Sequence, residues 1–141
     1  MNRIRIDVVI VNYNTADLLI ETLEQLPAAM PDWVDWSVFV ADNASADDSV
    51  ERLRAGFPDV ELVEMGWNAG FCRGNNAAIR RGDAEFVLLV NTDTRLFADT
   101  VEQLLDTMRD DPRAAVVAPR LEFADGRFQS GAAGAPFTLH S

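Results

Sequence analysis

Short apolar runs, each four or five residues long, recur along the first 120 residues of the chain. The clearest lie at Val8–Val11, Ser37–Ala41 and Phe86–Val90, and polar residues follow each of them. Apolar runs of this length without alternation are typical of strands that are buried on both faces. Weaker runs at Val60–Val63 and Ala115–Ala118 bring the prediction to four or five strands.

Apolar residues at helical spacing fill the segments between these runs. We expect Asn14 or Thr15 to cap the first helix and Pro27 to follow its end. Ser45, with the acidic residues after it, resembles a capping box for the second helix. The residues that mark the four helices are Leu18, Leu19, Leu23 and Leu26; Val50, Leu53 and Phe57, the expected inner face of the second; Phe71, Asn75, Ala78 and Ile79; and Val101, Leu104, Leu105 and Met108.

The alternation of strands and helices predicts an α/β fold with a doubly wound, mostly parallel sheet. After the last expected strand, Asp125-Gly126 between two apolar segments predicts a C-terminal β-hairpin. With 141 residues, the chain has the length of one domain. We therefore expect a single domain with an α/β core at 1–120, a hairpin at 121–130 and a loop or tail at 131–141.

The residue types that are missing exclude several classes of enzyme. All 12 cationic residues are arginines, so the chain has no lysine for a phosphate-binding loop, a Schiff base or a protein-kinase site. One cysteine and one histidine cannot supply the four ligands of a usual zinc site. A lone Cys72 fits a reducing compartment. No apolar run approaches the ~20 residues of a membrane span, so we expect a soluble, cytoplasmic protein.

The net charge of −11 argues against nucleic acid as a partner, because nucleic-acid binding needs a basic surface. It does not exclude a small anionic ligand. Scattered surface charges are screened beyond about 8 Å at physiological salt. A divalent cation ~4 Å from a phosphate attracts it by about 4 kcal/mol per charge pair even at an effective dielectric of 20.

Polar clusters follow three of the predicted strands, namely Asn12-Tyr13-Asn14, Asp42-Asn43 and Asn91-Thr92-Asp93. Ligands of open α/β sheets bind beyond the carboxyl ends of the strands, so we expect these clusters to converge. The first cluster has no glycine, which excludes the dinucleotide-binding turn. Asp42 and Asn43 are expected to be free for a ligand. Asp93 is an oxygen ligand suited to Mg²⁺ or Mn²⁺, or it only begins a turn or caps the next helix.

A fourth polar cluster lies in and after the glycine-containing loop 66–70. The helix N-terminus that follows would offer free amide groups to an anion. Arg73 either neutralises a phosphate or is an ordinary surface arginine. Asn75 and Asn76 are unfavourable inside a helix, which suggests that their amides bond something specific. Tyr13 is either a structural tyrosine or a ring on which a base could stack.

Four of these stretches, in this order, resemble the nucleotide-sugar-binding half of family 2 glycosyltransferases of the GT-A fold, in particular the rhamnosyltransferase-like bacterial branch. Pro119-Arg-Leu, Asp125-Gly126 and Gln129 also follow the order of that branch. Any one motif is weak, but four in the correct order and spacing are specific, and they cover nearly the whole chain. The four are Val8-Val-Ile-Val-Asn-Tyr-Asn-Thr15, Asp42-Asn-Ala-Ser-Ala-Asp-Asp-Ser49, Asn68-Ala-Gly-Phe-Cys-Arg-Gly-Asn-Asn76 and Leu88-Leu-Val-Asn-Thr-Asp-Thr94.

The resemblance implies a UDP- or dTDP-sugar as ligand and Mn²⁺ or Mg²⁺ as cofactor. Tyr13 and its neighbours would bracket the nucleobase, and Asp42 and Asn43 would hydrogen-bond the base and ribose. Asp93 corresponds to the last acid of the family's Asp-X-Asp motif and would bind the metal. Asn91 stands at the motif's first position, so metal affinity is expected to depend on bound nucleotide. The full implied set is Asn12, Tyr13, Asn14, Asp42, Asn43, Asn68, Gly70, Phe71, Arg73, Asn76, Asn91 and Asp93.

The resemblance also implies an acceptor-binding half whose Glu-Asp motif supplies the general base of an inverting transferase. No such motif follows Gln129, so we expect the base beyond Ser141 and little or no transfer by these residues alone. The full-length protein could then lie peripherally at the inner membrane face, and an exposed sheet edge leaves a homodimer open. The alternative is a non-catalytic α/β nucleotide-binding or interaction module derived from a transferase. Asn91 argues against a haloacid-dehalogenase phosphatase, which needs an aspartate nucleophile there.

Overall fold

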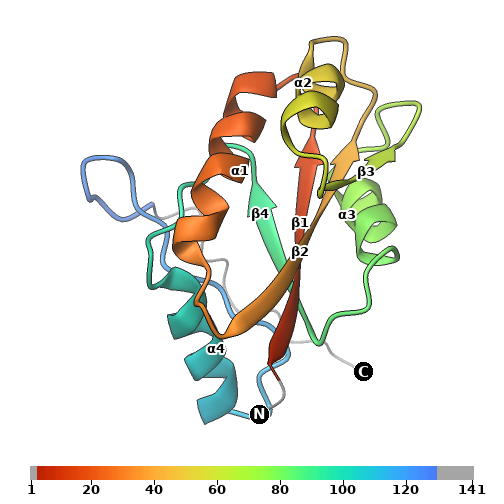
Figure 1. Cartoon of the computed structure of the whole chain (residues 1–141). Coiled ribbons are helices and arrows are strands. Elements are labelled where there is room, and N and C mark those ends of the chain that lie inside the picture. The colour runs from red at the N-terminus through yellow and green to blue at the C-terminus, as the bar shows by residue number, and fades with distance from the viewer. Residues whose placement is uncertain (1–2, 130–141) are drawn as a thin grey trace, which may run out of the picture. The chain divides into compact units, whose positions relative to one another are not determined.

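The computed structural model describes residues 3–129. Two compact units, Met1–Val101 and Glu102–Ser141, divide the chain, and each is described by itself. The elements in chain order (Figure 1) are β1 Ile4–Asn12, α1 Ala16–Ala29, β2 Val34–Asp42, α2 Ser49–Gly56, β3 Glu61–Glu64, α3 Phe71–Ile79, β4 Phe86–Asn91 and α4 Thr100–Asp110.

The sheet of the first unit has four strands in the order β3-β2-β1-β4, and every pair is parallel. This confirms the predicted α/β fold with a parallel sheet. The register sets Asn12 of β1 beside Asp42 of β2, and Val11 beside Asn91 of β4. The carboxyl ends of three strands therefore finish at the same level of the sheet.

Helices cover both faces of the sheet. On one face, α3 packs on a buried cluster that includes Val9, Phe39 and Ala78. Side chains alternate along a strand, so Val8 and Ile10 point to the opposite face, where both are fully buried. In Figure 1, α1 and α2 lie together on that side. Burying each such side chain contributes about 1.5–3 kcal/mol, so these apolar strands are a main source of the unit's stability.

Strand β4 differs from β1 and β2 in its burial. Val87 and Leu89 are 43% and 51% exposed, whereas Val90 is buried. The prediction that Phe86–Val90 is buried on both faces is therefore wrong. Within residues 3–129, β4 is an edge strand, and α3 contacts β1 and β2 instead.

The first helix runs past its proline. Pro27 was expected beyond the end of α1, but it lies inside the helix, which ends at Ala29. A proline removes only its own amide donor, so it affects the bond to the Leu23 carbonyl. Burial of the neighbouring residues offsets this loss and keeps the turn, because Leu26 before the proline and Ala29 and Met30 after it are all buried.

The predicted capping box at Ser45 is also wrong. The N-cap position of α2 is Asp48, which makes no side-chain capping bond. The carboxylate of Asp47 takes this role: it accepts from the Ser49 amide at 3.1 Å and also from the Ser49 hydroxyl. Its other oxygen accepts from the Ala16 amide at the start of α1, at 2.9 Å. One aspartate thus fixes the first turns of two helices.

The environment of Asp47 changes its acidity. Partial desolvation raises the pKa of this carboxyl, but the hydrogen bonds from the Ser49 hydroxyl and from the Ala16 and Ser49 amides outweigh it. The pKa of Asp47 therefore lies below its ordinary value of 3.8. The ionised form is the one that holds the two helix starts together.

A buried carboxylate also lies away from the strand ends. Asp7 of β1 is 6% exposed and accepts a hydrogen bond from the Ala84 amide at 2.9 Å. Gly82 passes so close that a Cβ on it would be 1.9 Å from Asp7 Oδ2. A side chain at position 82 would break this contact, so Gly82 is required for steric reasons.

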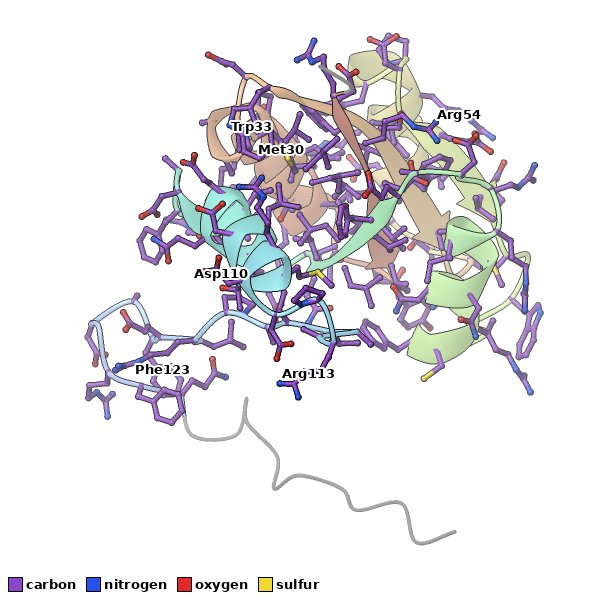
Figure 2. The ribbon with its side chains drawn as sticks, turned by 90° about the horizontal axis from the view of Figure 1, so that it is seen from below. Met30, Trp33, Arg54, Asp110, Arg113 and Phe123 are labelled. Carbon is purple, nitrogen blue, oxygen red and sulfur yellow. The ribbon has the colours of Figure 1, made fainter. Side chains whose placement is uncertain are left out.

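In the second unit, the strand predicted at Ala115–Ala118 does not form. The segment has no regular secondary structure and no strand partner among the described residues, and Val116 is 85% exposed. The predicted hairpin is confirmed as far as Gln129 by a bridge between Glu122 and Phe128. Figure 2 shows Phe123 in this hairpin. Ser130 and the predicted tail 131–141 lie outside the described residues.

Candidate functional site

A hydrogen-bonded network surrounds Asp42 where β2 ends. Asp42 Oδ1 accepts from Asn12 Nδ2 at 2.8 Å and from the Ser45 hydroxyl at 2.6 Å, and Oδ2 accepts from the Ser45 amide at 2.9 Å. Asp42 is only 3% exposed, and Asn12 is fully buried. Asp42 is therefore not free in the way the sequence predicts, because three acceptor positions of its carboxylate are used within the protein. The register explains this, because it sets Asn12 directly beside Asp42.

Ser45 joins the loop after β1 to the loop after β2. Its hydroxyl oxygen accepts from the Asn14 amide at 2.9 Å, and Asn14 Oδ1 accepts from the Ala46 amide at 2.7 Å. Asn14 and Ala44 both have left-handed backbone, with φ of 55° and 59°. Between Asn12 and Asn14, the Tyr13 side chain remains 48% exposed. The two loops are thus fixed to each other while the tyrosine stays accessible.

Asn43 connects the end of β2 to the start of α3. It is 3% exposed, so it is also not free in the expected way, and its Nδ2 donates to the Gly70 carbonyl at 3.4 Å. Its Oδ1 is buried and has no hydrogen-bond partner among residues 3–129. A buried acceptor without a donor costs free energy, which makes this amide oxygen a candidate contact for a bound molecule.

Helix α3 begins at Phe71, as the sequence predicted, with Gly70 as N-cap at φ 80°. No side chain caps this helix start in the described structure, and Phe71 is 55% exposed. The Asn75 amide bonds the Phe71 carbonyl of its own helix at 3.0 Å, so its specific partner is local. Asn76 is exposed.

The end of β4 is held by threonines. Thr22 Oγ1 donates to the Thr92 carbonyl at 2.9 Å. Thr15 Oγ1 donates to Asn12 Oδ1 at 2.7 Å and lies 3.1 Å from Thr92 Oγ1. Thr15 therefore joins the β1 and β4 ends, which the sequence pattern alone did not reveal.

Asn91 and Asp93, by contrast, are exposed and have no side-chain partner in the part of the chain that the structure describes. Helix α4 begins only at Thr100, so Asp93 does not cap it. A turn does form here, because the Thr94 amide donates to the Asn91 carbonyl at 3.1 Å. Asp93 is thus held by the turn while its carboxylate is available.

The predicted site residues are therefore divided by burial but lie at one edge of the sheet. The residues buried at that edge are Asn12, Asp42 and Asn43, and the exposed ones are Tyr13, Asn14, Asn68, Gly70, Phe71, Arg73, Asn76, Asn91 and Asp93. The sequence analysis missed Ser45 and Thr15 as parts of this edge. A serine three residues after an aspartate is typical of an Asx-type turn, which could have identified Ser45.

The described residues do not form a complete metal centre. No group of three or more His, Cys, Asp or Glu side chains within 3–129 is placed to hold a metal ion. Asp93 could supply one oxygen ligand. Mg²⁺ and Mn²⁺ commonly use one or two carboxylates with substrate phosphates and water, so Asp93 fits a metal shared with a ligand and not a permanently bound ion.

A separate cavity of about 510 Å³ lies between α1, β2 and the loop after α2. Its lining includes Leu23, Trp36 and Phe57 and none of the predicted site residues. Trp36 is in the first half of β2, so this cavity is at the other end of the strand from Asp42. Distance from the convergent polar groups excludes it as the candidate site. None of the helices in 3–129 is long and apolar enough to cross a bilayer.

The arrangement of the sheet and helices is that of GT-A glycosyltransferases. The mannosyltransferase PcManGT of Pyrobaculum calidifontis, solved with GDP-Man and Mn²⁺, matches with a TM-score of 0.65 and 28% identity over 78% of this chain and 34% of that one. S. aureus TarS, solved with UDP-GlcNAc, matches with a TM-score of 0.65 over 76% of this chain and 32% of that one, but at 21% identity this likeness supports the fold alone.

Residues 7–137 match the family model for glycosyl transferase family 2, and the chain belongs to that family. An N-acetylglucosaminyl-diphospho-decaprenol L-rhamnosyltransferase of Mycobacterium tuberculosis is 30% identical over 101 residues, 64% of this chain and 33% of the relative. An N-acetylglucosaminyltransferase of Bradyrhizobium diazoefficiens is 32% identical over 111 residues, 74% of this chain and 22% of the relative. The chain thus spans a third or less of these two relatives.

Proposed function

We propose that this chain binds the nucleotide-diphospho-sugar donor of an inverting glycosyltransferase, together with Mn²⁺ or Mg²⁺. The observation that carries this proposal is the meeting of the β1, β2 and β4 ends at one sheet edge, with Asp93 exposed and unpaired in the described structure. Membership of glycosyl transferase family 2 supports it. So does the nucleotide sugar bound to a solved structure with the same fold.

The nucleoside would lie against the β1 and β2 loops. The half-exposed ring of Tyr13 offers a face for stacking with the base. An ionised carboxylate has about four acceptor sites, and three of those on Asp42 are used internally, so one remains for a base N–H group. The unpartnered Oδ1 of Asn43 would accept from a base or ribose donor. Binding would thereby satisfy a buried oxygen that is otherwise costly.

The diphosphate would lie between α3 and β4. The uncapped first turn of α3 presents amide groups, and its dipole favours an anion there. Arg73 would add a positive charge. The metal, when bound, would neutralise the diphosphate as it leaves the sugar, and Asp93 would hold it from the protein side. Asn91 would contribute only a neutral side chain, so the nucleotide must complete the site.

The activity of the whole protein is part of this proposal. The mycobacterial and rhizobial relatives are at least three times longer than the stretch matched here. We therefore place the acceptor site and the general base in a part of the protein that this sequence does not include. The residues described here would transfer sugar poorly or not at all by themselves. A homodimer and a cytoplasmic location remain predictions.

Calorimetry with UDP- and dTDP-sugars in the presence of Mn²⁺ tests the donor site. We expect binding to the wild-type chain and a loss of about tenfold or more in affinity for Asp93→Ala, because a charged contact is worth about 1.5–3 kcal/mol. Asp59→Ala is the matched control, since this exposed aspartate is next to the separate cavity. The absence of binding by wild type, or equal affinity for both variants, would favour the non-catalytic module.

A further inference from the structure

The segment 65–82, which contains α3, differs in charge from the rest of the chain. It has three arginines, at 73, 80 and 81, and no aspartate or glutamate. The whole chain has a net charge of −11. This segment is therefore a local positive region on an acidic protein.

Three acidic residues near this segment form ion pairs. Each of these three lies within 4 Å of an arginine, which lowers its opposition to the positive region. Figure 2 labels one of these partners, Arg54. The pairs are Glu61 with Arg81 at 3.8 Å, Asp83 with Arg5 at 2.9 Å, and Glu64 with Arg54. Arg73 and Arg80 have no carboxylate partner in the described structure.

An exposed aromatic ring lies within the positive region. Trp67 is 55% exposed, and the Arg73 guanidinium lies 5.5 Å from the centre of its ring. Gly74 and Ala78 are buried against the sheet. Arg73 and the C-cap residue Arg80 are seven residues apart, so both lie on the outer side of α3, about 10.5 Å from each other along the axis. We name Trp67, Arg73, Arg80 and Arg81 the α3 patch.

We propose that the α3 patch binds the surface of an anionic phospholipid bilayer. Tryptophan prefers the boundary between headgroups and acyl chains, and arginine can extend its charge to the phosphates while its stem lies on apolar groups. Each basic residue near such a surface raises binding about five-fold. Acidic residues more than about 8 Å from the contact are screened at physiological salt, so the net charge of the chain does not prevent contact with the bilayer. A peptide partner would not require the combination of one interfacial ring with Arg73 and Arg80, the two arginines of the patch that have no carboxylate partner in the described structure.

Contact between the α3 patch and a bilayer would fix the position of the proposed donor site. Helix α3 begins at Phe71, and its N-cap Gly70 is hydrogen-bonded to Asn43 of the candidate donor site. A bilayer on the outer side of α3 would therefore hold the proposed donor site close to the membrane surface. The inference goes beyond the proposed function, because Trp67, Arg80 and Arg81 have no assigned role in nucleotide binding.

Vesicle sedimentation tests the proposal with the full 141-residue chain. We expect the wild type to bind vesicles that contain phosphatidylglycerol and to bind pure phosphatidylcholine vesicles at least tenfold more weakly. Arg80→Gln with Arg81→Gln should lower binding to the anionic vesicles by about tenfold or more, and Trp67→Ala by several-fold. Raising the salt concentration should lower it as well. Arg73 is kept, so that donor binding is not altered.

Two control variants remove a tryptophan ring or two arginine charges elsewhere in the first unit. Trp33→Ala removes a 38% exposed tryptophan, which Figure 2 shows beside Met30 and away from α3. Arg3→Gln with Arg52→Gln removes two ion-paired arginine charges outside the patch. Both should bind vesicles as wild type does. Circular dichroism establishes that all variants fold.

Three results would overturn the proposal: no binding to anionic vesicles, equal binding to both vesicle types, or equal losses in patch and control variants. Calorimetry with UDP and Mn²⁺ on the same variants separates this proposal from the donor site. Loss of vesicle binding with unchanged nucleotide affinity supports the α3 patch, even if the assigned donor residues prove wrong.

Discussion

The candidate donor site has two sides that differ in how their polar groups are held. Where β1 and β2 end, Asn12 and Asp42 are buried and bonded to each other at 2.8 Å. Where β4 ends, Asn91 and Asp93 are exposed and have no side-chain partner among residues 3–129. We infer that the first side is organised before a ligand arrives, while the second is completed by the metal and the diphosphate.

Removal of the carboxylate from the organised side should have the largest effect. Asp42→Ala leaves the Asn12 amide and both Ser45 donors without their acceptor in a buried place. We expect a loss of about 2–4 kcal/mol in the free energy of unfolding, measured by urea denaturation. Asp93→Ala should change it by no more than about 0.5 kcal/mol. Similar losses for the two variants would show that the two sides are not different.

Metal removal should weaken only the ligand contacts at the exposed β4 side of the candidate site. With EDTA, we expect the affinity of the wild-type chain for UDP to fall about tenfold, or about 1.4 kcal/mol. By linkage, UDP should raise the affinity for Mn²⁺ by the same factor. Titration calorimetry measures both quantities. Tight Mn²⁺ binding without nucleotide would contradict the proposal, since the described residues include no group of three ligands.

Thr15 allows the connection between the two sides to be measured. Its hydroxyl contacts Asn12 at 2.7 Å and Thr92 at 3.1 Å. Thr15→Val keeps the shape and removes these contacts, so we expect a loss of about 1 kcal/mol in unfolding free energy and a few-fold loss in UDP affinity. If stability falls but nucleotide affinity does not, the two sides act independently.

The smallest expected effect concerns pH. The pKa of Asp47 is lowered in the folded chain, so its contribution to stability is complete above the ordinary value of 3.8 and is lost as pH falls through the lower folded value. The group is exposed, which limits its contribution to about 0.5 kcal/mol or less. Urea midpoints of wild type and Asp47→Asn should converge below pH 3.8. A constant difference at all pH values would show that charge is not the cause.

The sequence predicted the sheet because its central strands are continuous apolar runs, and burial of such runs is hard to achieve in any other way. The same pattern failed at Val87 and Leu89, because composition does not reveal which strand lies at an edge. It failed again at Ala115–Ala118, where a short apolar run has no partner in the described structure. Strand character depends on pairing, which is not a property of the segment alone.

For the candidate site, the sequence located the edge but not the bonding within it. The sequence predicts a free Asp42 because this residue lies before the apparent helix cap at Ser45. Its burial depends on the register that places Asn12 opposite, and on Ser45, which bonds Asp42 instead of capping a helix. Such contacts between loops distant in sequence follow from tertiary structure and are not evident from local patterns.

The backbone at Ala44 has a consequence for the design of variants. An alanine with φ 59° is held against its own preference, and the turn that it forms delivers the Ser45 hydroxyl to Asp42. Glycine would adopt the same turn without the steric conflict, although it would also give the unfolded chain more freedom. The balance between these two terms makes Ala44→Gly a substitution that could raise the free energy of unfolding without changing a functional side chain.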